Sequence, residues 1–177
     1  MTKSLKNLSL IGAGLGLAIT SLAFAAGGGI LFPDWSKPVK GTYTAPAEEI
    51  GKAAKAGQPW SVTTVTSSIN GQPVKGEAIS LTGEVIDLSC YLQVGKHGAK
   101  HRDCGQKCLR NGQPIGLLTK DGTLYWLMEE EHDPRRDGLT NFRQAAIDNM
   151  AYIMEITGTS SEVSGQKAIY VTGYVKK

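Results

Sequence analysis

Residues 78–88, with the sequence AISLTGEVIDL, contain the pattern that decides the fold. Apolar side chains alternate with polar ones, as in a β-strand with one buried face. The alternation changes phase beside Gly83, so that the apolar side chains pass to the opposite face. The apolar residues are Ile79, Leu81 and Val85 on the first face, then Ile86 and Leu88 on the second. A phase change beside a glycine predicts a bulge or a sharp coil in a long strand, as a small barrel requires.

The chain on either side of this strand predicts further strands and one helix. Asp121-Gly122 is a turn signal between two β-like runs, and Thr140 is a good N-cap for a helix. Upstream, the Thr- and Val-rich residues 61–68 favour a leading strand, with a turn at Asn70-Gly71. The remaining elements that we expect are strands at 115–119 and 123–128, a helix at 141–150, and strands at 151–158 and 167–175.

This order of elements resembles the OB-fold, a five-stranded Greek-key barrel with a helix between its third and fourth strands. The resemblance covers residues 76–177 and depends on the order of the elements. It implies a mainly β, OB-like five-stranded barrel, with residues 89–114 as a Cys/His helical insertion after strand 1. OB-folds commonly bind oligonucleotides or oligosaccharides, but a fold does not establish a function.

The N-terminus has the pattern of an export signal. Lys3 and Lys6 precede an uncharged apolar run, and Ala23-Phe24-Ala25 matches a small-residue cleavage site. The run is also about long enough to span a bilayer, for which roughly 17–25 residues are needed. We therefore expect a cleaved signal peptide at residues 1–25, with a retained inner-membrane anchor as the alternative. Either reading places the protein in the periplasm or outside the cell.

Two further regions follow the export segment. Residues 26–60 are rich in glycine and proline and predict a tether, in which residues 47–56 favour a short helix and Trp35 and Trp60 hold the arm against the domain. Residues 61–177 form the OB-like domain. Loss of residues 1–25 lowers Lys+Arg from 19 to 17 against 16 Asp+Glu, a formal charge of +1. Such a near-neutral chain lacks the basic face that nucleic-acid binding needs.

The predicted insertion contains the candidate functional residues. They are Cys90, His97, His101, Cys104 and Cys108, and these three cysteines are the only ones in the chain. Residues 100–110 predict one short helix, on which positions 101, 104 and 108 fall within an arc of about 60°. Cys90 ends the long strand and can face this helix if the helix folds back over the barrel rim.

A metal site is the first of three arrangements that fit these residues. Cys90, Cys104 and Cys108 with one histidine form the Cys3His set of structural zinc sites. His101 is the favoured fourth ligand and His97 the substitute. Soft thiolates also suit Cu(I), so the cofactor that we expect is zinc or copper. Asp87, just before Cys90, either orients a histidine ligand or is a surface acid at the strand end.

The other two arrangements do not use a metal. An oxidising compartment favours a disulfide between Cys90 and either Cys104 or Cys108, with one thiol left over. Such a bridge closes a loop of roughly 15–19 residues, worth about 3 kcal/mol in the chain-entropy model. Alternatively, Cys104 near a helix N-terminus is a reactive thiol, although C-x-x-x-C is not the C-x-x-C of thiol oxidoreductases.

The local sequence Cys90-Tyr91-Leu92, His101-x-x-Cys104-x-x-x-Cys108 and Gly112-x-Pro114-x-Gly116-Leu117-Leu118-x-x-Asp121-Gly122 resembles a group of uncharacterised exported bacterial proteins. That resemblance implies no activity. The residues themselves predict an exported metal-binding accessory module rather than an enzyme, with an exported or membrane-bound protein as partner. If the metal is copper, its delivery to an exported or membrane oxidase fits the compartment. The alternative is a disulfide-stapled domain that binds a protein or a glycan.

Overall fold

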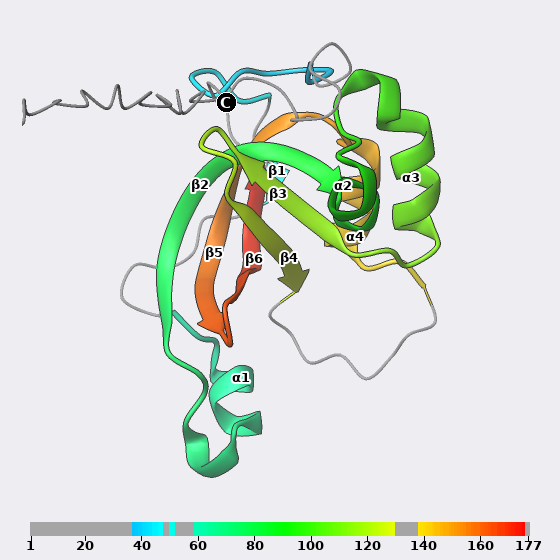
Figure 1. Ribbon diagram of the computed structural model, residues 1–177. Helices are drawn as coiled ribbons and strands as arrows, with labels where there is room; N and C mark the ends of the chain where they lie inside the picture. The colour runs from blue at the N-terminus through cyan, green and yellow to red at the C-terminus, as the bar shows by residue number, and fades with distance from the viewer. Residues whose placement is uncertain (1–36, 48–49, 52–58, 130–137, 176–177) are drawn as a thin grey trace, which may run out of the picture.

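The computed structural model describes residues 37–47, 50–51, 59–129 and 138–175 (Figure 1). The predicted export segment and Trp35 lie outside these residues. None of the described helices is both long and apolar enough to cross a membrane.

Five strands form a closed OB-like barrel, as the order of elements predicted (Figure 1). The strands are β2 (Gly76–Asp87), β3 (Ile115–Thr119), β4 (Leu124–Glu129), β5 (Ile153–Val163) and β6 (Gln166–Val175). They are hydrogen-bonded in the order β6-β4-β3-β2-β5, and the pairing of β5 with β6 closes the barrel. Only the β4–β6 pair within this barrel is parallel. Helix α4 (Asn141–Asp148) lies between β4 and β5 in the chain, and Thr140 caps it by accepting from the Arg143 N–H.

Strand β2 coils through Gly83 rather than bulging there. Residues 76–84 pair with β5 and residues 83–87 pair with β3, in continuous registers. A Cβ at Gly83 would lie 2.7 Å from both Leu117 Cγ and the Leu118 carbonyl oxygen, so only glycine permits this close crossing. The predicted change of face is confirmed, because Val85 joins the main core whereas Ile86 joins a smaller cluster.

The insertion after β2 contains two α-helices. Helix α2 (Leu88–Val94) follows the strand directly, and a 3-10 turn (η3, Ala99–His101) leads into α3 (Arg102–Arg110). The predicted helix from 100 to 110 therefore begins as a 3-10 turn. Helix α3 packs against α4 beside the barrel (Figure 1). The main core joins the barrel interior to α4 and to Leu109 of α3.

The prediction of a leading strand at residues 61–68 was wrong. Val62–Ser67 form helix α1, capped by the Ser61 hydroxyl, which accepts from the Thr64 N–H. The Thr66 and Ser67 hydroxyls donate to carbonyls four residues earlier. These polar side chains are therefore hydrogen-bonded within the helix, although the composition of the segment is typical of strands. The turn at 70–71 follows, within the 3-10 helix η2 (Ile69–Gly71).

The segment before α1 lies along the barrel. Ile50–Gly51 form β1, which pairs with β6, whereas we had expected a helix over residues 47–56. Backbone pairing to a sheet edge outweighs the weak helix propensity there, and residues 48–49 and 52–58 are outside the described part. Trp60 meets the Tyr170 ring edge-on at 5.0 Å and donates to the Val74 carbonyl, as its predicted anchoring role requires.

Candidate metal centre

Asp87 joins the barrel to the candidate site. It is the last residue of β2 and the N-cap of α2, and its side chain is fully buried. The carboxylate oxygen Oδ1 accepts from the backbone N–H groups of Ser89 and Cys90, at 3.0 and 3.3 Å. These bonds satisfy two of the amides that a helix start leaves unpaired. They also hold Cys90 in the first turn of α2, beside the carboxylate.

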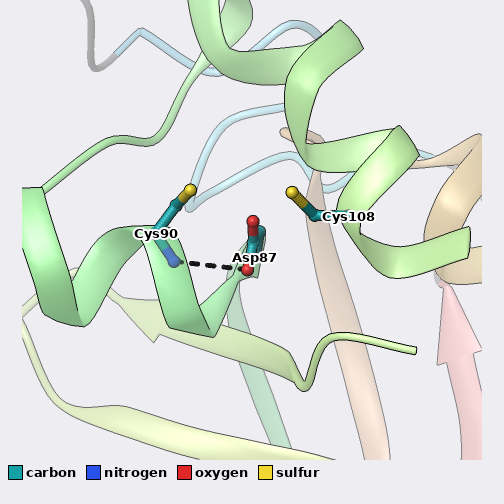
Figure 2. Close-up of side chains that lie close together, drawn as sticks. All are labelled: Asp87, Cys90 and Cys108. Atoms are coloured by element: carbon teal, nitrogen blue, oxygen red, sulfur yellow. Dashed lines mark hydrogen bonds between the residues drawn. The ribbon is translucent and has the colours of Figure 1, made fainter. Parts of the chain in front are cut away.

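Cys108 reaches the same point from the opposite side. It lies near the end of α3, and the residue after it, Leu109, is part of the main core. Figure 2 shows the Cys90 and Cys108 sulfurs on either side of the Asp87 carboxylate. One sulfur from each cysteine and one Asp87 oxygen all lie within 4.8 Å of one another. Two ligands bound to one transition-metal ion at 2.0–2.3 Å lie at most about 4.6 Å apart, so a small approach of these side chains would let them share an ion.

His101 approaches this cluster at the start of α3. Its Nε2 atom is 3.8 Å from Asp87 Oδ2, which is beyond hydrogen-bonding distance. The exposed fraction of the side chain is 3% for His101 and 0% for Asp87. Among the described residues, Asp87 Oδ2 and His101 Nε2 are the buried side-chain nitrogen or oxygen atoms without a hydrogen-bond partner. Burial lowers the pKa of His101, so its imidazole is neutral near pH 7 and has a lone pair for a metal.

The two thiols of the cluster hold their protons tightly. Burial, followed by the Asp87 carboxylate, raises the pKa of Cys90. The same two causes raise the pKa of Cys108 to about 12. A reactive thiolate needs a lowered pKa, so this environment does not suit a catalytic cysteine. A bound cation would reverse the effect, because its positive charge stabilises thiolate, carboxylate and neutral imidazole together.

His97, the predicted substitute ligand, lies elsewhere and has another partner. Its Nδ1 atom is 3.0 Å from Glu84 Oε2, and Glu84 Oε1 accepts from the Gly98 N–H at 2.6 Å. The His97 ring also meets Tyr91 edge-on at 5.5 Å between centroids. This buried pair attaches the loop between α2 and η3 to strand β2. The signal for this pair in the sequence is Glu84, which lies where the alternation of β2 changes phase. Our prediction did not use it.

Cys104, the third predicted thiolate ligand, is exposed and is not among the three clustered residues. In its place the structure contributes Asp87, for which a surface position was one of our two interpretations. That interpretation was wrong, because we did not predict helix α2. Asp87 is the N-cap of this helix, and its side chain is directed at the first amides of α2 and not at the solvent. The sequence signal was the Asp-x-x-Cys spacing, since an N-cap side chain reaches the amide two or three residues on.

No family model, curated protein or solved structure matches this chain. The chemistry of the site is therefore inferred from its own residues.

Proposed function

We propose that this chain is an exported accessory protein that binds one transition-metal ion at the rim of its OB-like barrel. Cys90 and Cys108 supply two thiolates, Asp87 a carboxylate oxygen and His101 an imidazole nitrogen. This donor set replaces the Cys3His set expected from the sequence, with Asp87 in the place of Cys104. The export part of the proposal is supported by the lysines and the apolar run of residues 1–25.

The observation that carries the proposal is the pair of buried atoms without partners. A disulfide between Cys90 and Cys108 would use both sulfurs but would leave Asp87 Oδ2 and His101 Nε2 as they are. Each buried polar atom without a partner costs about 1–3 kcal/mol. A metal ion accepts an electron pair from all four groups, so it accounts for the whole arrangement.

The donor set favours zinc. Two thiolates, one imidazole and one carboxylate give the four-coordinate set of nitrogen, sulfur and oxygen ligands that zinc accepts. Copper(I) is the second candidate, because the facing sulfurs of Cys90 and Cys108 form a soft pair. Copper(I) would bind the carboxylate more weakly, because a carboxylate is a hard ligand.

The same geometry favours a binding role over catalysis. Catalytic zinc sites keep one position open for water or substrate, whereas structural sites take all four ligands from the protein. Here Asp87, Cys90 and Cys108 place ligand atoms within 4.8 Å of one another, the His101 imidazole lies 3.8 Å from the Asp87 carboxylate, and Asp87 and His101 are buried. We therefore infer that the site stores, carries or is stabilised by its ion.

Metal and thiol content measured together test the proposal. Protein exported into an oxidising compartment should contain about one zinc per chain, and Cys90 and Cys108 should react with a thiol reagent only after chelation. Its intact mass also reports removal of residues 1–25. A chain without metal, with one free thiol and a mass lower by two hydrogen atoms, would instead establish the disulfide-stapled interaction domain.

Matched serine variants locate the ligands. Cys90→Ser and Cys108→Ser should lose stoichiometric zinc, whereas Cys104→Ser, at the exposed thiol of the same insertion, should keep it. Free zinc at 100 times its Kd should stabilise the wild-type fold by about 2.7 kcal/mol, so chelation should lower Tm. Equal zinc loss in all three variants would contradict the ligand assignment.

A further inference from the structure

The exposed thiol of Cys104 lies next to the candidate site without belonging to its cluster. We propose that Cys104 is the entry ligand through which the metal ion passes between the buried site and a thiolate-bearing partner. This inference rests on the proposed function, and it adds a route and a class of partner to the same site.

The placement of Cys104 on α3 carries this inference. Cys104 and Cys108 are four residues apart on α3, so their side chains are neighbours on the helix surface, whereas His101 lies in the preceding 3-10 turn. Of these three side chains, His101 is buried, Cys108 is half-buried and Cys104 is exposed. Cys104 is therefore the thiol that a partner can reach most directly, one helical turn before Cys108.

The candidate site itself supplies a second, independent observation. Asp87 Oδ2 and His101 Nε2 form the destination of the ion, since they lack hydrogen-bond partners in the described part of the chain. The proposed donor set of Asp87, Cys90, Cys108 and His101 is complete without Cys104. The Cys104 sulfur is therefore not needed to hold the ion at equilibrium and can take part in its exchange.

The transfer is a ligand exchange with no change in oxidation state. A metal–sulfur bond to Cys104 forms as one metal–sulfur bond to the partner breaks. Cys108 and Cys90 then displace the remaining ligands, including Cys104, as the ion moves inward. Each incoming thiol gives up its proton, and each departing thiolate can take one up, so that charge and protons balance. Release follows the same steps in reverse.

The surface around Cys104 indicates the charge of the partner. Lys100, in the turn η3, and Lys107, on α3, lie on either side of Cys104 in the chain and are exposed, as are Arg110 and Asp103 of α3. The excess of positive charge favours approach by an acidic surface. The partner that fits is a protein or peptide that holds its ion through thiolates with acidic groups beside them.

Rapid-mixing kinetics with two zinc sources test the route. Metal-free protein is mixed with the zinc complex of glutathione, a small acidic thiol, or with hydrated zinc. Cys104→Ser should slow uptake from the thiolate complex about tenfold or more, because it removes a nucleophile held beside the site. Uptake of hydrated zinc and the equilibrium Kd should change by less than about twofold, since the four ligands remain. Asp103→Asn, at the neighbouring exposed position, keeps the Cys104 thiol and removes a negative charge, so it should not slow uptake from the thiolate complex, and its Kd should match that of the wild type.

The possible outcomes separate the two proposals. Equal rates for wild type and Cys104→Ser with the thiolate complex would overturn the entry role alone. A Kd weakened by the same factor as the rate would also overturn it, because Cys104 would then be a permanent ligand. If the wild type takes up zinc from neither source, the proposed function fails and the entry role fails with it.

Discussion

At the scale of single residues, one carboxylate connects the fold to the candidate site. Asp87 Oδ1 caps helix α2, whereas Oδ2 is directed toward the sulfurs and His101. The two oxygens therefore have separable roles. The cap positions Cys90 whether or not an ion is bound, and the second oxygen contributes only when a cation is present.

Asp87→Asn separates these two roles. Asparagine caps helices about as well as aspartate, so the metal-free variant should keep its stability to within about 1 kcal/mol. Its zinc affinity should fall by about 10–100-fold, the usual loss when a group that supports a metal site is removed. Asp87→Ala should lose zinc affinity and, in addition, about 1 kcal/mol of helix capping. Calorimetric titration and chemical denaturation measure both quantities, and an unchanged affinity in Asp87→Asn would exclude the carboxylate from the site.

The raised thiol pKa values predict that metal binding strengthens with pH. Below the pKa of Cys90 and of Cys108 both thiols are protonated, and zinc must displace both protons. Affinity should therefore rise between pH 6 and 8, by up to about 100-fold per pH unit when two protons are released. Competition with a chelator of known pH dependence measures this slope. A slope near zero would show that the thiols are not ligands.

The stability of the metal-free fold should change with pH in the opposite direction, falling as the pH rises. The pKa of Cys108 is about 12 in the folded chain, above the value near 8.5 of an unfolded cysteine. The stabilising contribution is therefore fully present below about pH 8.5 and is lost as the pH rises towards 12. Cys108→Ser removes the titrating thiol, so denaturation curves of this variant should show a weaker loss above pH 8.5 than those of the wild type.

At the scale of elements, helices α3 and α4 satisfy each other's terminal carbonyls. Arg102 of α3 donates to the carbonyls of Asp148 and Met150, and Arg143 of α4 donates to those of Leu109 and Gln113. Helix ends leave such carbonyls unpaired, and a cation there also interacts favourably with the helix dipole. This reciprocal capping holds α3, and with it Cys108, against the barrel.

Arg102→Ala tests the contribution of this capping. The variant loses two charge-assisted hydrogen bonds and the contact of the guanidinium with the Tyr152 ring at 4.7 Å. We expect a loss of about 2–3 kcal/mol in the free energy of unfolding, and weaker zinc binding because α3 moves. Arg102→Lys cannot make the paired contact with both carbonyls. Its free energy of unfolding should therefore lie between that of the wild type and that of Arg102→Ala. Denaturation by urea measures the loss, and a change below about 0.5 kcal/mol would place the capping among ordinary surface contacts.

Two segments show where local sequence misleads. Residues 61–68 have the composition of a strand, but they pair with no strand among the described residues, and hydroxyl bonding inside helix α1 prevails. Helix α2 was missed for a related reason. Leu88 continues the alternation of β2, and only the capping by Asp87 shows that the chain turns there.

At the scale of the whole molecule, closure of the barrel depends on the contact between β5 and β6. The register between them shifts beside Gly158, where the two strands come very close. A Cβ at this position would lie 2.2 Å from the Tyr170 carbonyl oxygen, a backbone atom that cannot swing aside. Glycine at 158 is therefore a requirement of closure.

Gly158→Ala should destabilise the barrel strongly. The added methyl group must push the two backbones apart, and overpacking of this kind costs about 1–3 kcal/mol or more. Gly138→Ala is the matched control, because a Cβ there meets no atom of the described residues within 4 Å. Thermal denaturation of both variants should show a large fall in Tm for the first and almost none for the second. Equal Tm values would mean that the strands separate at little cost.

The order of strands, the helix cap at Thr140 and the change of face in β2 were readable from local patterns, because periodicity and capping depend on neighbours in the chain. The clustering of Asp87, Cys90 and Cys108, with His101 beside Asp87, was not, since it depends on the angle at which two short helices return over the barrel rim. Nearness in sequence placed Cys104 among the expected ligands, whereas in the folded chain its thiol is exposed and lies outside the cluster. Helix docking is set by side chains far apart in the chain, and for that reason only the folded structure could choose which oxygen, nitrogen and sulfur atoms meet.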